Sequence, residues 1–146
     1  ALTQLSEGVK QKTFSVYAAE SWANSGITVE PGDLIYVEAA NSWSVSPNYG
    51  QASMFGYADT LNSAYAINNQ YALGALLYRV RGSQYRNGYG FNQYSRGEAD
   101  TAGRLEFTIN DSQLRNNSGG LTLNIIVLSR EDVANVVAAF DKQSGT

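Results

Sequence analysis

The chain is organised around residues 103–128, which read GRLEFTIND (103–111), SQLRNNSGG (112–120) and LTLNIIVL (121–128). In the first part, Leu105, Phe107 and Ile109 alternate with charged or polar residues. In the last part, every second residue from 121 to 127 is Leu, Ile or Val. Alternation with a period of two is typical of a strand that buries one face. We therefore predict two half-buried strands joined by a polar loop.

The loop between these strands carries Asp111, Asn116 and Asn117. Carboxylate and amide oxygens at the tip of a loop are the hard ligands that calcium prefers. The same residue types also build ordinary turns, because they tolerate unusual backbone angles and bond to their own backbone. These residues alone are therefore compatible with a calcium loop and with an ordinary hairpin turn.

The composition narrows the possible functions. With 146 residues, 43% of them hydrophobic, the chain fits one domain, residues 1–146, with a sizeable core. The 14 glycines and the many β-branched and aromatic residues favour strands joined by tight turns. The sequence has no cysteine and no histidine, which excludes a disulfide framework and imidazole-based catalysis. A metal site would have to use oxygen ligands, as calcium, magnesium and manganese do.

The charge and hydropathy argue against two further classes of partner. The net charge is −3 and the pI is about 4.8, whereas nucleic-acid binding needs a basic surface. Residues 82–102 interleave tyrosine with arginine, as some RNA-binding segments do. We interpret them instead as an edge hairpin that turns at Asn87-Gly88. No apolar run approaches the roughly 20 residues that span a bilayer, so we expect neither nucleic acid nor a membrane span.

Further elements follow along the chain. We predict strands within residues 9–19, at 27–29, over 34–40 and over 72–81, and we expect the strand over 34–40 to be largely buried on both faces. Residues 41–59 form a long aromatic loop, which is usually a functional feature, and 61–71 are ambiguous. Ser129 begins a capping-box helix over 129–142, which would cover an edge of the core or form a subunit contact.

Several of these motifs occur in an order that resembles a known family. They are PGDLIYVEAA (31–40), the loop around Trp43, Gly74-Ala75-Leu76, Ile109-Asn110-Asp111 and NNSG (116–119). Over about residues 16–126 the chain resembles the calcium-dependent galactophilic lectins of the Pseudomonas lectin A type. The resemblance implies an all-β fold, a small antiparallel, jelly-roll-like β-sandwich to which the short C-terminal helix is added. It also implies Ca²⁺ as cofactor, galactose-type glycans as partners, no enzymatic activity and a bacterial source, and we expect a homo-oligomer.

In that family an Asp, two adjacent Asn and two backbone carbonyls hold the calcium ion, and two neighbouring sugar hydroxyls complete its coordination. The ligands implied here are Asp111, Asn116, Asn117, a carbonyl of Gln113 or Leu114, and a carbonyl of Val45 or Ser46. The implied sugar contacts are Asp111 and Asn116. Asn62 and Tyr65 are added because they occupy the positions of the family's second sugar-binding segment. Two features differ: the loop is two residues shorter than in the family, and residues 59–65 lack the family's His, Pro and Gln.

Two other functions fit the sequence. The domain could be a non-catalytic structural or adhesion module in which the loop is an ordinary turn. A carboxylate-based glycosidase would need two acids at catalytic separation, and nothing in the spacing of the acidic residues pairs them. We therefore expect no enzyme. Ala1 could follow a removed methionine or a cleaved leader, so a cytoplasmic and a secreted location are both compatible with the sequence.

Overall fold

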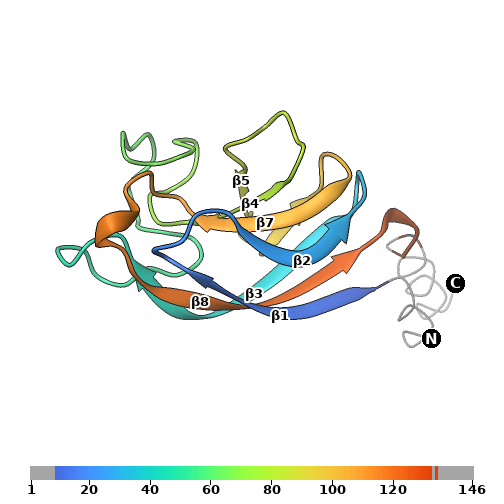
Figure 1. The fold of residues 1–146 in the computed structure, drawn as a ribbon, viewed down its shortest axis with the longest axis horizontal. Coiled ribbons are helices and arrows are strands. Elements are labelled where there is room, and N and C mark those ends of the chain that lie inside the picture. The colour runs from blue at the N-terminus through green and yellow to red at the C-terminus, as the bar shows by residue number, and fades with distance from the viewer. Residues whose placement is uncertain (1–8, 133, 135–146) are drawn as a thin grey trace, which may run out of the picture.

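The computed structural model describes residues 9–132 and residue 134, and places eight strands in two antiparallel sheets (Figure 1). One sheet has the order β1-β8-β3-β6 and the other the order β2-β7-β4-β5. The strands are β1 (Lys10–Tyr17), β2 (Ala23–Val29), β3 (Leu34–Ser44), β4 (Leu76–Val80), β5 (Tyr89–Gly90), β6 (Arg96–Glu98), β7 (Gly103–Ile109) and β8 (Ser118–Leu128). The predicted all-β sandwich is confirmed.

The core lies between the two sheets and follows the predicted alternation. Leu121, Leu123, Ile125 and Val127 of β8 are each at most 1% exposed, and they face Phe107 and the other inward residues of the second sheet. Burying a large aliphatic side chain contributes about 1.5–3 kcal/mol. The alternation in residues 121–127 therefore determines which face of β8 packs inward.

The two predicted core strands are not equally buried. β7 is buried on both faces, because Glu106 and Thr108 on its outer side are 6% and 0% exposed. The prediction that residues 34–40 are buried on both faces is wrong: Ile35 and Val37 are buried, but Glu38 and its neighbours on the outer face are open to solvent. The difference has a visible cause, because the loops at 60–72 and 82–88 rise on the outer side of β4 and β7, so that the β2-β7-β4-β5 sheet is the one they cover (Figure 1).

Strand and turn boundaries also differ from the sequence-based expectation. The predicted strand at 72–81 begins only at Leu76, because a turn closes from the Ala75 amide to the Ala72 carbonyl. The predicted two-residue turn at Asn87-Gly88 is wrong. β4 and β5 pair as an edge hairpin, but residues 81–88 all lie between them, and the Gly88 amide closes a turn onto the Tyr85 carbonyl.

The predicted helix start at Ser129 is confirmed. The Asp132 amide donates to Ser129 Oγ at 3.1 Å, and Ser129 Oγ donates to the Asp132 carboxylate at 2.9 Å, which together cap the first turn. The rest of the helix predicted over 129–142 lies outside the described residues, apart from residue 134. No helix within the described part of the chain is long and apolar enough to cross a membrane.

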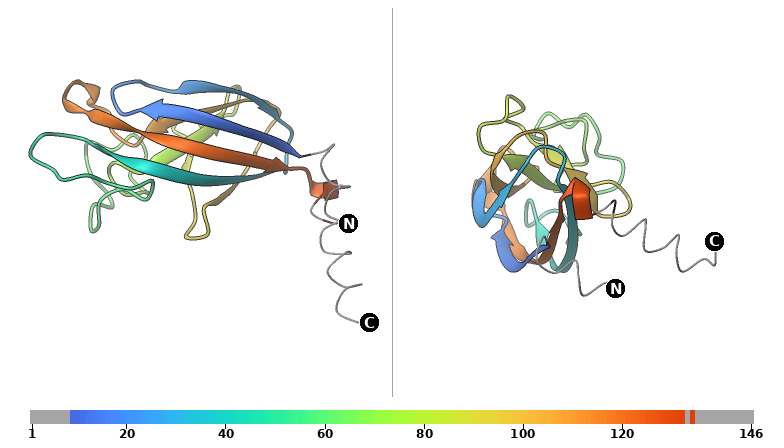
Figure 2. Two further views of the ribbon diagram at one scale, coloured as in Figure 1. Left: turned by 90° about the horizontal axis from the view of Figure 1, so that it is seen from below. Right: turned by 90° about the vertical axis from the view of Figure 1, so that its right-hand side faces the viewer.

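The strands run along the long axis of the molecule, so the loops gather at its two ends (Figure 2). In Figure 1 the loop after β7 and the loop after β3 lie at the same end, away from the end of β8. Trp43 joins the layers there, because its Nε1 donates to the Gly74 carbonyl at 2.7 Å. The fold thus brings residues 43–50, 73–74 and 110–117 together.

Candidate cation-binding site

A pocket of about 250 Å³ lies at this end of the sandwich. Its lining residues are Val45, Ser46, Tyr49, Tyr65, Leu73, Asp111, Gln113 and Asn116. The structure therefore brings together six of the predicted site residues, from three segments that are far apart in sequence. Leu114, Asn117 and Asn62 do not belong to the lining.

Asp111 is the acidic residue of the pocket, and it is only 3% exposed. Its Oδ1 accepts a hydrogen bond from the Gln113 amide at 2.9 Å. Burial raises the pKa of Asp111 above its usual value, while the Gln113 amide and the side chain of Asn117 oppose that rise. None of the ion pairs among the described residues involves Asp111. A buried carboxylate in such surroundings is stabilised in its charged form by a cation.

Asn117, on the same loop, has a buried oxygen without a hydrogen-bond partner among the described residues. Its Nδ2 donates to the Ala18 carbonyl at 2.8 Å, which fixes the orientation of the amide. Its Oδ1 is buried and accepts no hydrogen bond from the described residues. An unsatisfied buried polar atom costs about 1–3 kcal/mol. An oxygen oriented in this way suits a metal ion, which would supply the missing partner.

The loop geometry distinguishes between the alternative carbonyls. A short 3₁₀ helix, η2 (Leu114–Asn116), follows Gln113, and the Leu114 carbonyl already accepts the Asn117 amide at 3.1 Å. Gln113 lines the pocket and Leu114 does not. Of the predicted pair, Gln113 is therefore the better placed to offer a carbonyl.

The same comparison applies to the loop after β3. The Ser46 carbonyl accepts hydrogen bonds from Ser44 Oγ at 2.7 Å and from the Tyr49 amide at 3.0 Å. Val45 has its amide held by the Tyr57 hydroxyl at 3.2 Å, and that hydroxyl also donates to the Gly50 carbonyl at 2.6 Å. Both Val45 and Ser46 line the pocket, but the Val45 carbonyl is the less engaged of the two.

Asn110, the residue before Asp111, holds the neighbouring loop in place. Its side-chain Oδ1 accepts from the Asn68 amide at 2.9 Å, and its Nδ2 lies 2.9 Å from the carbonyls of both Asn68 and Ala72 and 3.2 Å from that of Tyr71. The residue is fully buried. A wholly satisfied buried amide rigidifies the segments it joins, and here it joins residues 68–72 to the end of β7.

The two predicted sugar contacts from residues 59–65 lie in different places. Tyr65 lines the pocket and is 55% exposed. It is tied to the loop after β7, because its carbonyl accepts both the amide and the hydroxyl of Ser112 at 2.7 Å. Asn62 is exposed and forms a turn with a φ of 65°, a left-handed conformation that asparagine tolerates well. Its amide donates to the Asn69 carbonyl, and it is not part of the lining.

Two residues of the pocket were not predicted from the sequence. Tyr49 belongs to the aromatic loop at 41–59, whose composition marked it as functional without identifying a residue. Leu73 precedes β4, in a stretch predicted to be strand. Tyr49 packs against Tyr57 with ring centroids 5.3 Å apart, and it is 50% exposed. The pocket therefore combines the exposed rings of Tyr49 and Tyr65 with the buried carboxylate of Asp111.

The chemistry available for a metal is restricted. Across the described residues there is no group of three or more His, Cys, Asp or Glu side chains placed to share an ion. A cation at this pocket would have one carboxylate, that of Asp111, and otherwise neutral amide and carbonyl oxygens. Such a set suits calcium, which accepts amide and backbone carbonyl oxygens readily.

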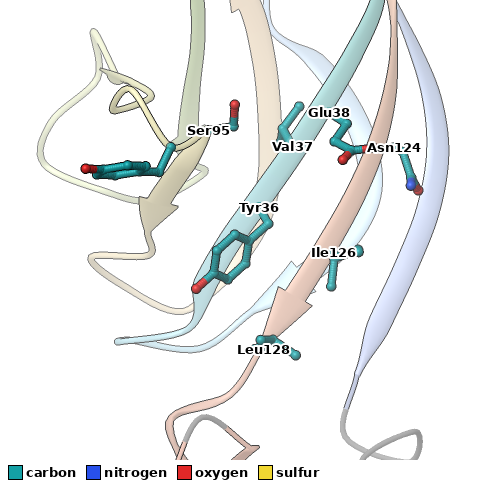
Figure 3. A pocket seen from close by; sticks show the side chains of 8 residues that line it. Tyr36, Val37, Glu38, Ser95, Asn124, Ile126 and Leu128 are labelled. Carbon is teal, nitrogen blue, oxygen red and sulfur yellow. The ribbon is translucent and has the colours of Figure 1, made fainter. Parts of the chain in front are cut away.

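A second groove lies on the outer face of β3 and β8 (Figure 3). It is lined by Tyr36, Val37, Glu38, Tyr94, Ser95, Asn124, Ile126 and Leu128. Glu38 is the single carboxylate among these residues. The groove therefore lacks the pair of acids on which glycoside hydrolysis normally depends.

No known family model matches the chain, and no curated protein matches it. Among solved structures eight chains match, including one described as "EclA N-terminal domain; PllA-like lectin". The TM-score to that structure is 0.59 at 15% sequence identity, and the alignment covers 83% of this chain and 98% of the other. This chain therefore shares the fold of a PllA-like lectin domain.

Proposed function

We propose that this protein is a calcium-dependent lectin whose carbohydrate site is the pocket around Asp111. The observation that carries the proposal is that one loop holds both the buried Asp111 carboxylate and the buried Oδ1 of Asn117. Within residues 9–132, the first has no cationic partner and the second no hydrogen-bond donor. The fold shared with a PllA-like lectin domain supports the same conclusion. Galactose or a related sugar is the proposed ligand, following the family resemblance of residues 109–119.

The residues that would hold calcium are Asp111, Asn116, Asn117 and the carbonyls of Gln113 and Val45. Calcium takes about six to eight oxygen ligands, so this set leaves positions open. When bound, the ion would supply Lewis-acid positions for two neighbouring sugar hydroxyls. With only one formal negative charge in the protein shell, those positions remain attractive to neutral hydroxyl oxygens.

The other residues of the pocket would orient the sugar. Asp111 can accept hydrogen bonds from sugar hydroxyls, and the Asn116 amide can donate to or accept from them; charge-assisted bonds to Asp111 would be the stronger. The half-exposed rings of Tyr49 and Tyr65 offer apolar faces to the C–H groups of a pyranose. Leu73 adds a further apolar contact.

The pocket volume indicates how much of a glycan can be bound. At about 250 Å³ it lies below the roughly 300–1,000 Å³ usual for sites of drug-sized ligands. It suits a single terminal sugar, for which we expect weak affinity per site. Useful binding would then require several copies of the site in a homo-oligomer, because avidity raises affinity without new contacts.

The test is a thermal melt of the metal-free protein titrated with calcium. A ligand that binds only the folded state stabilises it and so raises the melting temperature. At a free calcium concentration of a hundred times Kd, the stabilisation is about 2.7 kcal/mol. The rise should be absent in Asp111→Ala and retained in Glu38→Gln, which removes an exposed carboxylate from the outer face of β3. A wild-type protein that shows no shift in saturating calcium would refute the metal site.

A glycan array run with calcium or with chelator then identifies the sugar. Binding of galactosides that disappears with chelator and in Asp111→Ala is the expected result. If calcium stabilises the protein but no glycan binds, the ion has a structural role and the adhesion-module alternative is favoured. If glycans bind equally with chelator, the proposed calcium bridge is wrong.

A further inference from the structure

Four arginines gather at the opposite end of the β2-β7-β4-β5 sheet, in the region that the proposed lectin site does not use. We call Arg79, Arg81, Arg86 and Arg104 the arginine cluster. Arg79, Arg81 and Arg86 line a pocket of about 370 Å³ together with Val80, Gly82 and Ser83. Arg104 is the second residue of β7, whereas Asp111 lies just beyond the other end of the strand, so at about 3.3 Å per residue the two lie about 23 Å apart along the strand direction.

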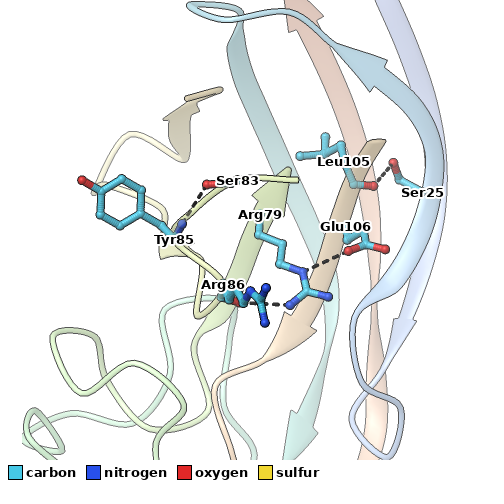
Figure 4. Close-up of polar contacts among 7 residues, drawn as sticks. All are labelled: Ser25, Arg79, Ser83, Tyr85, Arg86, Leu105 and Glu106. Carbon is cyan, nitrogen blue, oxygen red and sulfur yellow. Dashed lines mark hydrogen bonds and ion pairs between the residues drawn. The ribbon is translucent and has the colours of Figure 1, made fainter. Parts of the chain in front are cut away.

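Arg79 is held in a fixed position by three contacts, and Figure 4 shows those with Glu106 and Arg86. Its Nε pairs with the buried Glu106 carboxylate at 2.9 Å, and its guanidinium lies 4.1 Å from the centroid of the Trp22 ring. Its Nη1 donates to the Arg86 carbonyl at 3.0 Å. Arg79 thus fixes the backbone at Arg86. The guanidinium group of Arg86 takes no part in that contact.

Arg81 and Arg104 place like charges next to each other. The pairing of β4 with β7 ends at Val80 opposite Leu105, and the Arg81 amide then donates to the Arg104 carbonyl at 2.8 Å. Directly opposite residues of an antiparallel pair present their side chains on the same face, where like charges are destabilising. The neighbour of Arg104 on β2 is Thr28, which carries no charge.

The cluster has more donors and positive charge than the surrounding acceptors satisfy. Arg104 Nε is buried and has no hydrogen-bond partner among the described residues. Within the described residues, the ion pairs are Arg79–Glu106 and Arg130–Glu98. No ion pair there involves Arg81, Arg86 or Arg104. Asp100 is linked to the pocket through Ser83, and its carboxylate accepts hydrogen bonds from Ser83 Oγ at 2.6 Å and from the Tyr89 hydroxyl at 3.0 Å.

Charge and shape together indicate the kind of ligand. Four arginines against Glu106 and Asp100 leave an excess of two positive charges, in a chain whose net charge is −3. Guanidinium groups bind planar and tetrahedral oxyanions through paired hydrogen bonds. Tyr85 does not line this pocket, but it lines an adjoining hollow that Arg86 shares. Its ring is 59% exposed and packs on Tyr89 with centroids 5.6 Å apart, so a sugar whose acidic group is held at Arg86 could place a ring on it.

We propose that the arginine cluster, with Tyr85, is a second carbohydrate site that binds the sulfate ester or carboxylate of an acidic oligosaccharide. The site works without calcium and is separate from the pocket at Asp111. A nucleic acid fits these observations less well, because the excess charge is confined to one pocket and does not extend as a basic groove along the acidic chain.

The test is isothermal titration calorimetry of the full chain in chelator, which removes any contribution from calcium. The probes are a heparin-derived sulfated hexasaccharide, a hyaluronate hexasaccharide with carboxylates only, neutral maltohexaose and a single-stranded DNA hexamer. We expect one of the two acidic sugars to bind, more weakly as salt rises, and maltohexaose not to bind. Whichever acidic sugar binds more tightly identifies the recognised group.

Matched variants locate the binding. Arg81→Gln combined with Arg86→Gln should weaken the acidic sugar about tenfold or more, because two charge-assisted contacts are lost. Arg96→Gln, an exposed arginine of β6, should change the affinity by less than about twofold. Tyr85→Ala should weaken binding about threefold, in proportion to a lost aromatic contact. The melting temperature of Arg81→Gln should not fall, because the substitution relieves repulsion with Arg104.

Four outcomes would overturn the proposal. They are an absence of binding to both acidic sugars, unchanged affinity in the double variant, equal binding of maltohexaose, and DNA binding as tight as that of the better sugar. If the double variant unfolds, Arg86→Gln alone carries the test, since the Arg86 side chain is exposed and forms no ion pair in the described structure. Loss of calcium binding at Asp111 would leave all of these results unchanged.

Discussion

Replacing Asn110 with Ala should destabilise the protein by about 3–5 kcal/mol. The side chain of Asn110 makes four hydrogen-bond contacts with residues 68–72, one through Oδ1 and three through Nδ2. Each net hydrogen bond contributes about 0.5–1.5 kcal/mol, and each buried group left without a partner costs about 1–3 kcal/mol. Nδ2 carries two hydrogens for three carbonyls, and water can reach the half-buried Asn68 and Tyr71, so the full sum is not reached.

A loss of this size is a large part of the roughly 5–15 kcal/mol that holds a domain folded. Equilibrium unfolding in urea measures it, as a lower midpoint with an unchanged slope. Asn69→Ala is the matched control, because Asn69 is an exposed residue of the same loop, and it should change the free energy of unfolding by less than about 0.5 kcal/mol. If Asn110→Ala and Asn69→Ala unfold at the same urea concentration, Asn110 does not stabilise this end of the sandwich.

Three further predictions concern other parts of the structure. Burial raises the pKa of Asp111 from its ordinary value of 3.8, so the folded protein binds the Asp111 proton more tightly than the unfolded chain does. Without calcium, the free energy of unfolding should therefore fall as pH rises from 3.8 through the raised pKa. Melting curves across that range should show the fall in wild type and not in Asp111→Asn, and a wild-type curve parallel to that of the variant would contradict it. Gly97→Ala should lower the free energy of unfolding by about 1–3 kcal/mol, because the added Cβ would lie 2.5 Å from the Tyr78 ring. Unfolding in urea measures this loss. A variant as stable as wild type would show that Tyr78 can move aside. Arg79→Ala should lower the free energy of unfolding by about 3 kcal/mol, because it leaves Glu106 charged and buried. Adding Glu106→Gln should recover part of that loss. A double variant no more stable than Arg79→Ala would contradict the ion-pair explanation.

The sequence predicts best those features that local pattern determines. The alternation in residues 121–127 predicted the buried face of β8, and Ser129 with Asp132 predicted a helix cap, because both signals lie within a few residues. β7 shows where this approach fails. Glu106 looked like a solvent-facing residue by its alternation, yet it is buried because Arg79, 27 positions earlier, covers and neutralises it.

The candidate site divides in the same way. The loop residues Asp111, Asn116 and Asn117 stood out by their chemistry, and the family resemblance added the carbonyls at 45–46. Nothing in the sequence indicated that the Asn110 amide would bind the backbone 42 residues earlier. Leu73 was likewise hidden within a predicted strand. Contacts between distant segments depend on the way the sheets pack, which periodicity does not encode.

The edges of the two sheets have a consequence for how copies of this protein can meet. At one side the sheets end in β5, with two residues, and β6, with three, which expose few free amides and carbonyls. At the other side β1 carries Lys10 and Lys12, whose ammonium groups reach across to the backbone of β2, and β2 has an irregular register. Strand addition and amyloid-like stacking are therefore disfavoured at each edge. An assembly of these domains would be expected to form through sheet faces or loops, leaving the sandwich closed.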